Sequence, residues 1–298
     1  AHLGSRAFDA IGGEVVNVTA DVIYNGRAAC KGAYVRLVDI NGSEAKRLKL
    51  LEAIQNPDCG WFYRRSADTF KQIPGTPIAY WASDGLINSF ENGKRLGDIT
   101  DTHLGMATCD NERFLRLWWE VGKKKRALPE EYPYTFTDVS WAPYNKGGIF
   151  RKWYGNDEYV VNWSGDGKVL AEAGAVMVNE ALRFRPMISW TRVSSGSLAV
   201  RLKPSGFMFD MTGPAAFGLA NKLKFNAAFL NSSVGLMVAR FLSASLDFQP
   251  GQIATYPIIQ NEEREPSVND MVDSCCGLSK TDWDSFETSW DFKRHPLV

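Results

Sequence analysis

Hydrophobic residues recur at every second position near the start of the chain. Between residues 15 and 24, polar side chains mainly separate the apolar ones, which are Val16, Val18, Ala20 and Val22. This period of two is typical of a strand that buries one face. A second strand is predicted at residues 34–39, and an Asn41-Gly42 turn then leads into a predicted helix at residues 43–54. One side of that helix carries Leu48, Leu51 and Ile54.

The rest of the chain alternates short strands with helical patterns. Strands are predicted at residues 159–163, 188–193, 198–202 and 207–210, with glycine-containing turns near them at residues 165–167, 194–196 and 204–206. Residues 114–121 predict a helix or a long strand. The apolar run at residues 219–246 predicts a buried helical element that is split near Asn231-Ser232-Ser233. Together these elements predict a mixed α/β chain of the α+β class.

Two domains fit the chain better than one. It has 298 residues, of which 45% are hydrophobic and 23% charged, as is typical of a globular protein with enough apolar material for a core. The segment QIPGTPIAYW at residues 72–81 holds two prolines and a glycine, which predicts an extended linker into a second domain. Because the sequence runs directly into fold-forming segments without an initiator methionine, we expect a piece of a longer protein.

Charge is distributed unevenly although the 34 basic and 34 acidic residues cancel. Residues 1–112 carry 12 basic and 14 acidic side chains, for a net charge of −2. Residues 113–203 carry 15 and 9, for a net charge of +6, and residues 204–298 carry 7 and 11, for a net charge of −4. The basic middle third could neutralise phosphates, or it could form a solvated cationic face.

Cysteines and common catalytic motifs give little support for a cofactor or metal site. Cys30, Cys59, Cys109, Cys275 and Cys276 show no CxxC spacing, which argues against a zinc module or a disulfide framework and favours the reducing cytoplasm. Walker, HExxH, GxSxG and GxGxxG motifs are absent, and only three histidines are present. The most apolar run is interrupted by polar residues, so we predict no membrane span.

Residues 144–163, YNKGGIFRKWYGNDEYVVNW, interleave glycines, aromatic rings, basic side chains and amides. That mixture suits a surface that contacts a polyanion with flat bases. The same residue types also build ordinary β-structure with a solvated edge. The residues alone leave both interpretations open.

Six stretches follow one another along the chain: AHLGSRAFDAIGGEVV, IPGTPIAYW, GMATCDNERFLRLWWEV, PYNKGGIFRKWYGNDEYVVNW, FLNSSVGLMVARFLSASLDFQPGQIATYPII and SWDFKRHP. In this combination they resemble the PglX-type adenine-specific DNA methyltransferases of BREX phage-defence systems. The resemblance covers essentially the whole chain, which fits the middle of that longer family.

The resemblance implies a parent enzyme that transfers a methyl group from S-adenosylmethionine to N6 of adenine in duplex DNA. In this class a glycine-containing loop holds the cofactor and an Asn/Asp-Pro-Pro-Tyr/Phe motif holds the flipped adenine. The sequence has neither, since Asn56-Pro57-Asp58-Cys59 and Ala142-Pro143-Tyr144 match the second motif only in part. Methyl transfer needs the amine and the sulfonium methyl in one pocket. We therefore expect no catalytic, cofactor-binding or metal-binding residues here, no S-adenosylmethionine bound and no activity of this chain alone.

The same resemblance divides the chain into three regions. Residues 1–72 would form the C-terminal part of a methyltransferase domain, with the last strands of its sheet. Residues 73–262 would form a mixed α+β target recognition domain, in which an LNS helix and a Pro-Ile segment recur. Here these segments are Leu230-Asn231-Ser232 and Tyr256-Pro257-Ile258. Residues 263–298 would begin a following region that is cut off.

Two kinds of contact with duplex DNA are predicted under this resemblance. Arginine pairs with guanine and asparagine with adenine in the major groove, so base contacts are expected from Asn111, Arg113, Arg116, Asn145, Asn156 and Asn162. Phosphate contacts, which position a duplex without reading it, are expected from Lys123, Lys124, Lys125, Arg126, Lys146, Arg151 and Lys152. Structural alternatives are a solvated face for Arg116, a helix C-terminus for the KKKR run and a turn for Asn156.

Three functions compete on these observations. The first is a DNA sequence-recognition module. The second is a scaffold that docks other BREX subunits or phage inhibitor proteins, which the ten tryptophans and the acidic last third favour. The third is a self-contained enzyme, which would have to bind S-adenosylmethionine.

Overall fold

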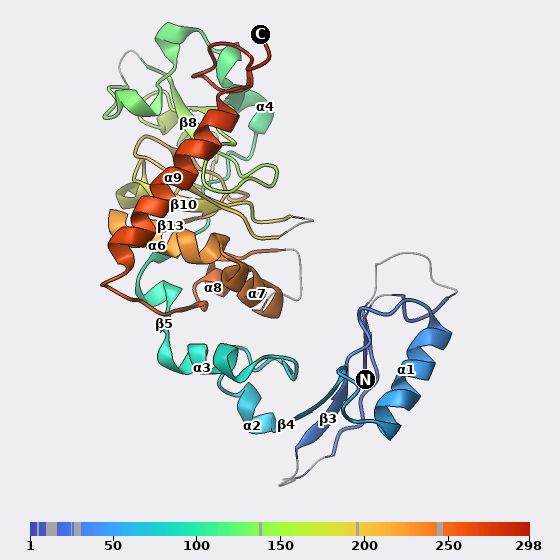
Figure 1. The fold of residues 1–298 in the computed structure, drawn as a ribbon. Coiled ribbons are helices and arrows are strands. Elements are labelled where there is room, and N and C mark those ends of the chain that lie inside the picture. The colour runs from blue at the N-terminus through green and yellow to red at the C-terminus, as the bar shows by residue number, and fades with distance from the viewer. Residues whose placement is uncertain are drawn as a thin grey trace. The chain divides into compact units, whose positions relative to one another are not determined.

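The computed structural model describes residues 1–4, 6–9, 17–24, 26, 31–136, 139–194, 197–242 and 247–298. The chain divides into two compact units, residues 1–91 and residues 92–298. Short strands form small sheets and helices pack against them (Figure 1), which confirms the predicted α+β class.

The first unit contains two small antiparallel sheets and three helices. Strands β1 (His2–Gly4) and β2 (Val18–Thr19) form one sheet, and β3 (Gly32–Val35) and β4 (Phe62–Arg65) form the other. The helices are α1 (Ser43–Gln55), α2 (Ala67–Phe70) and α3 (Asp84–Asn92), whose last residue already belongs to the second unit. Val35, Leu37 and Ala53 form the centre of its core.

The sequence pattern located the first helix well and the first strands less well. The helix predicted at residues 43–54 is α1, but its apolar side faces solvent: Leu48, Leu51 and Ile54 are 54%, 44% and 66% exposed. The helix buries Ala53 and Lys46 instead. The strand predicted at residues 34–39 is displaced to Gly32–Val35. Of the strand predicted at residues 15–24, β2 is a two-residue part, and residues 15 and 16 lie outside the described residues.

The segment at residues 72–81 is not a linker, so that prediction was wrong. Ala79 and Tyr80 are buried, and the Tyr80 ring stacks on Tyr34 with the ring centres 4.8 Å apart. The aromatic side chains therefore fold the segment back onto the sheet of the first unit. The boundary between the two compact units falls between Glu91 and Asn92 in the sequence, whereas the functional division after residue 72 stays a prediction.

Two four-stranded sheets form the centre of the second unit. The first has the order β11-β10-β13-β6, and these strands span Val200–Lys203, Met187–Trp190, Ala215–Phe217 and Asp101–His103. The second has the order β12-β8-β9-β7, and these strands span Met208–Phe209, Trp141–Asn145, Tyr159–Asn162 and Leu115–Leu117. All neighbours are antiparallel except β12, which runs parallel to β8. A further pair joins β5 (Lys94–Arg95) to β14 (Pro257–Ile258).

The strand register decides which side chains of the second sheet reach its outer face. Leu115, Val161 and Ala142 lie side by side on β7, β9 and β8, and all three are core residues. Because successive side chains of a strand point to opposite faces, Arg116 and Asn162 lie on the face opposite to that core. The sheet thus places two of the predicted DNA-contacting residues on one surface.

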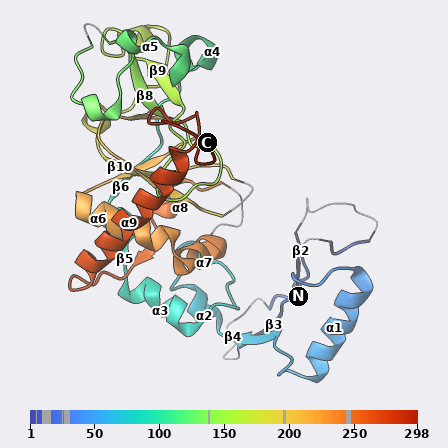
Figure 2. The ribbon, with the colours of Figure 1, turned by 45° about the horizontal axis from the view of Figure 1, so that its top comes forward.

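Helices cover the first sheet and connect it to the end of the chain. Helices α6 (Ala220–Asn231) and α7 (Ser233–Leu242) are separated at Ser232, as the sequence predicted. The long helix α9 (Glu265–Trp283) lies alongside α6 in both views (Figures 1 and 2), and Lys224 pairs with Asp273 between them at 2.6 Å. Shorter helices are α4 (Asn111–Phe114), α5 (Lys168–Glu172) and α8 (Pro250–Ile253).

Five short 3-10 turns complete the described elements: η1 (Leu96–Asp98), η2 (Trp118–Glu120), η3 (Lys123–Lys125), η4 (Pro129–Glu131) and η5 (Glu180–Leu182). Residues 114–121, predicted as one helix or long strand, form the end of α4, strand β7 and η2. The predicted strands at residues 188–193, 198–202 and 207–210 correspond to β10, β11 and β12 with shorter bounds. Residues 195–196 of one predicted turn, and residues 243–246 of the predicted helical run, lie outside the described residues.

Residues after 262 belong to the packing of the second unit. The Trp118 indole nitrogen donates to the carbonyl oxygen of Thr288 at 2.8 Å, and the Trp290 ring lies against Phe207. These contacts link the turns after α9 to the core of the second unit.

Candidate nucleic-acid interface

Three residues predicted to read bases are exposed on consecutive elements, α4 and β7. The Asn111 side chain accepts a hydrogen bond from the Thr108 hydroxyl at 2.6 Å, so its amide nitrogen stays available. The Arg113 guanidinium lies 4.8 Å from the centre of the Phe114 ring. Arg116 donates to the carbonyl oxygens of Glu112 and Leu115.

The other three residues predicted to contact bases form hydrogen bonds within the fold. Asn145 is fully buried, and its amide nitrogen donates to the Ser189 hydroxyl at 2.6 Å and to the Gly213 carbonyl at 3.0 Å. Asn156 is also buried, has a left-handed φ of 60° and donates to the Ile149 carbonyl at 2.9 Å. We therefore leave Asn145 and Asn156 out of any DNA contact. Asn162 is half-buried and accepts two hydrogen bonds from Ser164.

Lys123, Lys124 and Lys125 form the exposed turn η3. In the part of the chain that the structure describes, no carboxylate lies within ion-pair distance of these three ammonium groups. A run of three uncompensated cations creates a positive local potential, which attracts phosphates.

The other four predicted phosphate contacts already have partners within the chain. The Arg126 guanidinium donates to the carbonyl oxygens of Trp118 and Val121. Lys146 lies 3.5 Å from the Asp210 carboxylate, and Arg151 pairs with Asp282 at 3.2 Å. Lys152 donates to the carbonyl oxygen of Asn231, at the end of α6, at 2.7 Å. These partners hold loops and helices together, so the four cations are less available than the η3 lysines.

Tryptophans connect the free and the committed cations into one surface. The Arg116 guanidinium lies 5.9 Å from the centre of the Trp141 ring, and that of Arg126 lies 4.7 Å from the centre of Trp118. Trp118 in turn contacts Trp119, which is 45% exposed. We call this set the tryptophan–cation surface: Arg116, Trp118, Trp119, Lys123, Lys124, Lys125, Arg126 and Trp141. The sequence predictions missed these tryptophans, although the WWE segment at residues 118–120 closely precedes the KKKR run at residues 123–126.

The ends of the stretch at residues 144–163 belong to the core. Tyr144 and Trp163 are fully buried, and the Tyr144 hydroxyl donates to the Asp210 carboxylate at 2.7 Å. Burial beside this carboxylate raises the pKa of Tyr144 well above its usual value. For these two residues the structural interpretation of the stretch is correct.

A buried ionic cluster fixes the middle of the same stretch. The Lys203 ammonium group pairs with the Asp157 carboxylate and donates to the Gly155 carbonyl at 2.8 Å. Arg201, beside it on β11, donates to the Arg151 carbonyl at 3.1 Å. Burial raises the pKa of Asp157 and lowers the pKa of Lys203, and it lowers the pKa of Arg201 to about 10. The cluster anchors residues 151–157 to the first sheet.

Helix α9 covers one side of this loop. Trp283 lies under the Arg151 guanidinium, 4.9 Å from the ring centre, and the Lys280 ammonium group lies 5.3 Å from the centre of the Tyr154 ring. The Cys276 thiol lies 3.8 Å from the Trp153 carbonyl oxygen. Only the part of the loop before Arg151 is therefore open to a macromolecular partner, at Gly148, Ile149 and Phe150.

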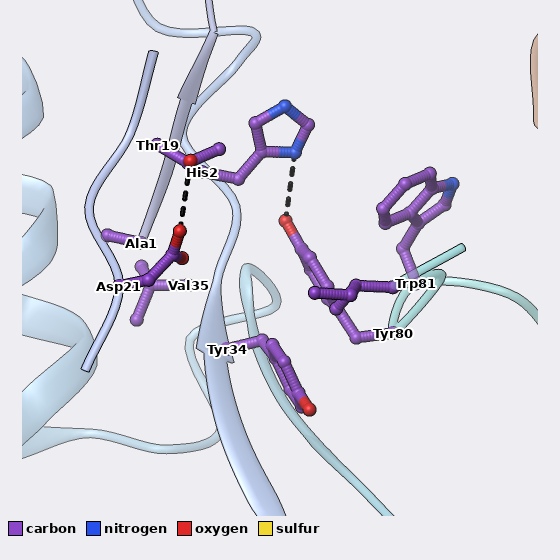
Figure 3. Close-up of a pocket in the computed structure, with 9 residues that line it drawn as sticks. Ala1, His2, Thr19, Asp21, Tyr34, Val35, Tyr80 and Trp81 are labelled. Carbon is purple, nitrogen blue, oxygen red and sulfur yellow. Dashed lines mark hydrogen bonds between the residues drawn. The ribbon is translucent and has the colours of Figure 1, made fainter. Parts of the chain in front are cut away.

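A cavity of about 200 Å³ lies in the first unit, between β1, β2, β3 and residues 78–81 (Figure 3). Aromatic rings of Tyr34, Tyr80 and Trp81 form much of its wall, and the Tyr80 hydroxyl lies 3.2 Å from Nδ1 of His2. Burial lowers the pKa of His2 and raises the pKa of Tyr80 to about 12. Both groups are therefore neutral near pH 7, which does not favour a phosphate site here.

A wider groove of about 580 Å³ opens on the second unit. Its walls include Tyr132, Tyr134, Phe136 and Phe184, and Lys168, the first residue of α5, also lines it. The Tyr134 hydroxyl donates to the Gly206 carbonyl at 3.0 Å, and desolvation raises the pKa of this phenol. These rings continue the core around Trp163 to the surface.

Among the described residues, His, Cys, Asp and Glu side chains form no group of three that could hold a metal ion. No single helix in the described ranges is long and apolar enough to cross a membrane, although α6 and α7 reach that length and composition as a pair bent by 72°.

Known proteins with related sequences agree with the resemblance that the six motifs suggested. The chain is 38% identical over 309 aligned residues to the adenine-specific methyltransferase PglX of Lacticaseibacillus casei (strain Zhang). It is 37% identical over 309 aligned residues to the adenine-specific methyltransferase BrxX of Escherichia coli O9:H4 (strain HS). Both alignments cover 100% of the chain. The resemblance to PglX-type adenine-specific methyltransferases is confirmed.

The two PglX-type relatives are much longer than this chain, which covers 26% of the first and 24% of the second. The chain thus spans about a quarter of the length of the curated relatives it matches. No protein-family model matches the chain.

Proposed function

We propose that this chain is the DNA sequence-recognition part of an N6-adenine DNA methyltransferase. The observation that carries the proposal is its alignment, from end to end, with a quarter of two adenine-specific methyltransferases. Such enzymes must bind a duplex and select a site before a base is taken out of the stack. The proposal gives the full-length protein S-adenosylmethionine as its methyl donor, and gives this chain the binding of duplex DNA.

The tryptophan–cation surface supports the DNA-binding part of the proposal. Its three η3 lysines are free to neutralise phosphates, and phosphate contacts supply most of the affinity of proteins for DNA. Its exposed Trp119 adds a flat apolar ring beside those cations. A solvated cationic face would not need such a ring next to it.

Different residues would position and read the duplex. Lys123, Lys124 and Lys125 would hold the phosphates. Asn111, Arg113 and Arg116, which are exposed on α4 and β7, would approach base edges. Arg126, Lys146, Arg151 and Lys152 would chiefly hold the fold itself together, as their contacts within the chain indicate.

Catalysis would belong to the rest of the full-length protein. The sequence contains no two adjacent prolines, so no Pro-Pro adenine-holding motif is present in these 298 residues. A calorimetric titration of the chain with S-adenosylmethionine should therefore release no heat of binding. Binding of the cofactor would favour the self-contained enzyme instead.

The test is the affinity of the full 298-residue chain for duplex DNA at increasing salt concentration. We expect binding at low salt that weakens steeply as the salt concentration rises. The slope of log K against log salt is negative, and each phosphate contact makes it steeper by about 0.9. Replacing Lys123, Lys124 and Lys125 with alanine should make this negative slope less steep by up to about 3.

Arg47, Lys49 and Lys71 provide the matched control, because each is already paired with a carboxylate and none is buried. Replacing these three with alanine removes the same formal charge and should leave the slope unchanged. No DNA binding at low salt, or equal slopes for the two triple variants, would contradict the proposal.

A second candidate function is a scaffold that docks partner subunits or phage inhibitor proteins. Exposed apolar side chains on and near α9 favour it: Leu219, Met271 and Leu278 are 71%, 58% and 74% exposed. The chain should then retain protein partners from a host extract after nuclease treatment. Loss of these partners when Met271 and Leu278 are changed to serine would support this function.

A further inference from the structure

The loop between β8 and β9 exposes two large apolar side chains at its tip. Ile149 and Phe150 are 68% and 52% exposed, and they follow directly after Gly147 and Gly148. Contiguous exposed apolar side chains can mark an interaction site. This tip is also the part of the loop that α9 leaves open.

The tip is held rigidly although its side chains are free. The Thr212 hydroxyl donates to the Lys146 carbonyl at 2.7 Å, and the Thr191 hydroxyl donates to the Gly148 carbonyl at 2.9 Å. The Asn156 amide donates to the Ile149 carbonyl at 2.9 Å. Side chains from three different segments thus fix three carbonyl groups of one short loop. A loop ordered before binding loses little conformational entropy when it binds.

The two glycines are required by the path of the backbone. Gly147 has a φ of 87°, and a Cβ atom there would lie 2.7 Å from the Thr212 carbonyl oxygen. Gly148 has a φ of 109°, and a Cβ atom there would lie 2.8 Å from the Asn156 amide nitrogen. Any other residue would clash in this conformation. The sequence therefore selects a fixed loop that ends in Ile149 and Phe150.

The charges around the tip favour a polyanionic partner. Residues 144–153 contain three cations and no acidic side chain. Lys146 and Arg151 flank the tip, and each retains donors beyond its single carboxylate contact with Asp210 or Asp282. An apolar tip between cations matches a base step between two phosphates better than it matches an apolar protein surface.

We propose that Ile149 and Phe150 form a wedge that enters a base step of duplex DNA. Proteins that insert apolar side chains in this way unstack the step partially and bend the duplex. The proposal rests on the DNA-binding function proposed above and adds a specific mode of contact.

A closed-circular plasmid tests this wedge without knowledge of the recognised sequence. Relaxation of the plasmid by topoisomerase in the presence of the full chain should leave a linking-number change, because an opened step unwinds the duplex. Changing Ile149 and Phe150 to serine should abolish that change. The affinity should fall by less than about tenfold, because the phosphate contacts remain.

The matched control changes Ile259 and Phe286 to serine, since these side chains are 61% and 46% exposed elsewhere on the second unit. That variant should bind and unwind the plasmid like the unmodified chain. Thermal unfolding of all three proteins checks that each is folded.

The outcomes separate the two proposals. DNA binding by the unmodified chain without a linking-number change would overturn the wedge and leave the DNA-binding function in place. Normal unwinding of the plasmid by the serine variant of the tip would also overturn the wedge and leave the DNA-binding function in place. The tip would then be a surface for contact with a protein. A chain that binds no DNA at low salt would overturn the DNA-binding function itself.

Discussion

The side chain of Asn231 binds both backbone polar groups of Val200. Its carbonyl oxygen accepts from the Val200 amide at 2.9 Å, and its amide nitrogen donates to the Val200 carbonyl at 2.9 Å. The Asn231 backbone carbonyl also accepts from Lys152. The asparagine of the LNS segment thus pairs with the backbone of strand β11 as a neighbouring strand would. Its backbone carbonyl also joins α6 to the loop after β8.

We predict that Asn231→Ala lowers the free energy of unfolding by about 1–3 kcal/mol, because the buried Val200 amide loses its partner. The Val200 carbonyl keeps the Trp153 amide, which donates to it at 2.8 Å. Asn226 is the matched control. It lies on the same helix, is fully buried and has no side-chain hydrogen bond to any described residue. Asn226→Ala should therefore cost clearly less in urea unfolding. Equal losses for the two variants would show that the pairing with Val200 contributes nothing.

The buried pair of Asp157 and Lys203 should be sensitive to removal of one partner. Lys203→Met leaves a carboxylate without its cation in the core, which costs about 3–5 kcal/mol in comparable cases. Combining it with Asp157→Asn removes the unpaired charge and should recover part of that loss. Urea unfolding of both single variants and the double variant measures the coupling. Additive effects would mean that the two groups do not interact.

The same variants predict a dependence on pH. Burial raises the pKa of Asp157 in the folded state, and Lys203→Met removes the cation that opposes this rise. The folded variant then holds a proton on Asp157 more tightly than the unfolded chain does. Its stability is greatest below the unfolded pKa and is lost as the pH rises through the folded pKa. Unfolding at about pH 5 and about pH 8 should show the loss in Lys203→Met and not in the double variant.

The periodic elements of the fold could be predicted from the sequence, and the contacts between residues far apart in the sequence could not. Helix α1 and the break at Ser232 followed from apolar spacing and polar interruption. The segment at residues 72–81 was mistaken for a linker because prolines and glycines mark irregular backbone whether it is exposed or buried. Its stacking of Tyr80 on Tyr34 joins residues 46 positions apart, which no local pattern records.

The candidate interface was predicted at the level of segments rather than of side chains. The three lysines of the KKKR run are exposed, but Asn145 and Asn156 are buried, and a Ser189 hydroxyl and the Gly213 and Ile149 carbonyls accept their amide protons. An asparagine that reads a base and one that ties two loops look alike in a sequence. Only the partners that the fold brings together distinguish them.

Burial should make the described cysteines differ in reactivity. The Cys109 side chain is exposed, whereas desolvation raises the pKa of Cys276 to about 11. At about pH 9 only about 1% of the Cys276 thiol would be ionised, and the thiolate is the reactive form. Pulse alkylation with peptide mass spectrometry should label Cys109 first and Cys276 last. In denaturant the two rates should become similar, and similar rates in the native chain would contradict the burial of Cys276.

Trp119 should contribute to DNA affinity in a way that differs from the η3 lysines. Its ring is 45% exposed and carries no charge, so Trp119→Ala should weaken binding of the full chain to duplex DNA without changing the salt slope. Burying a large apolar side chain is worth about 1.5–3 kcal/mol, and we expect a loss of no more than that. Phe286→Ala, at 46% exposure on the same unit, is the control and should bind normally. If Trp119→Ala instead makes the salt dependence less steep, as the lysine variant does, the ring acts by holding the cations in place rather than by touching DNA.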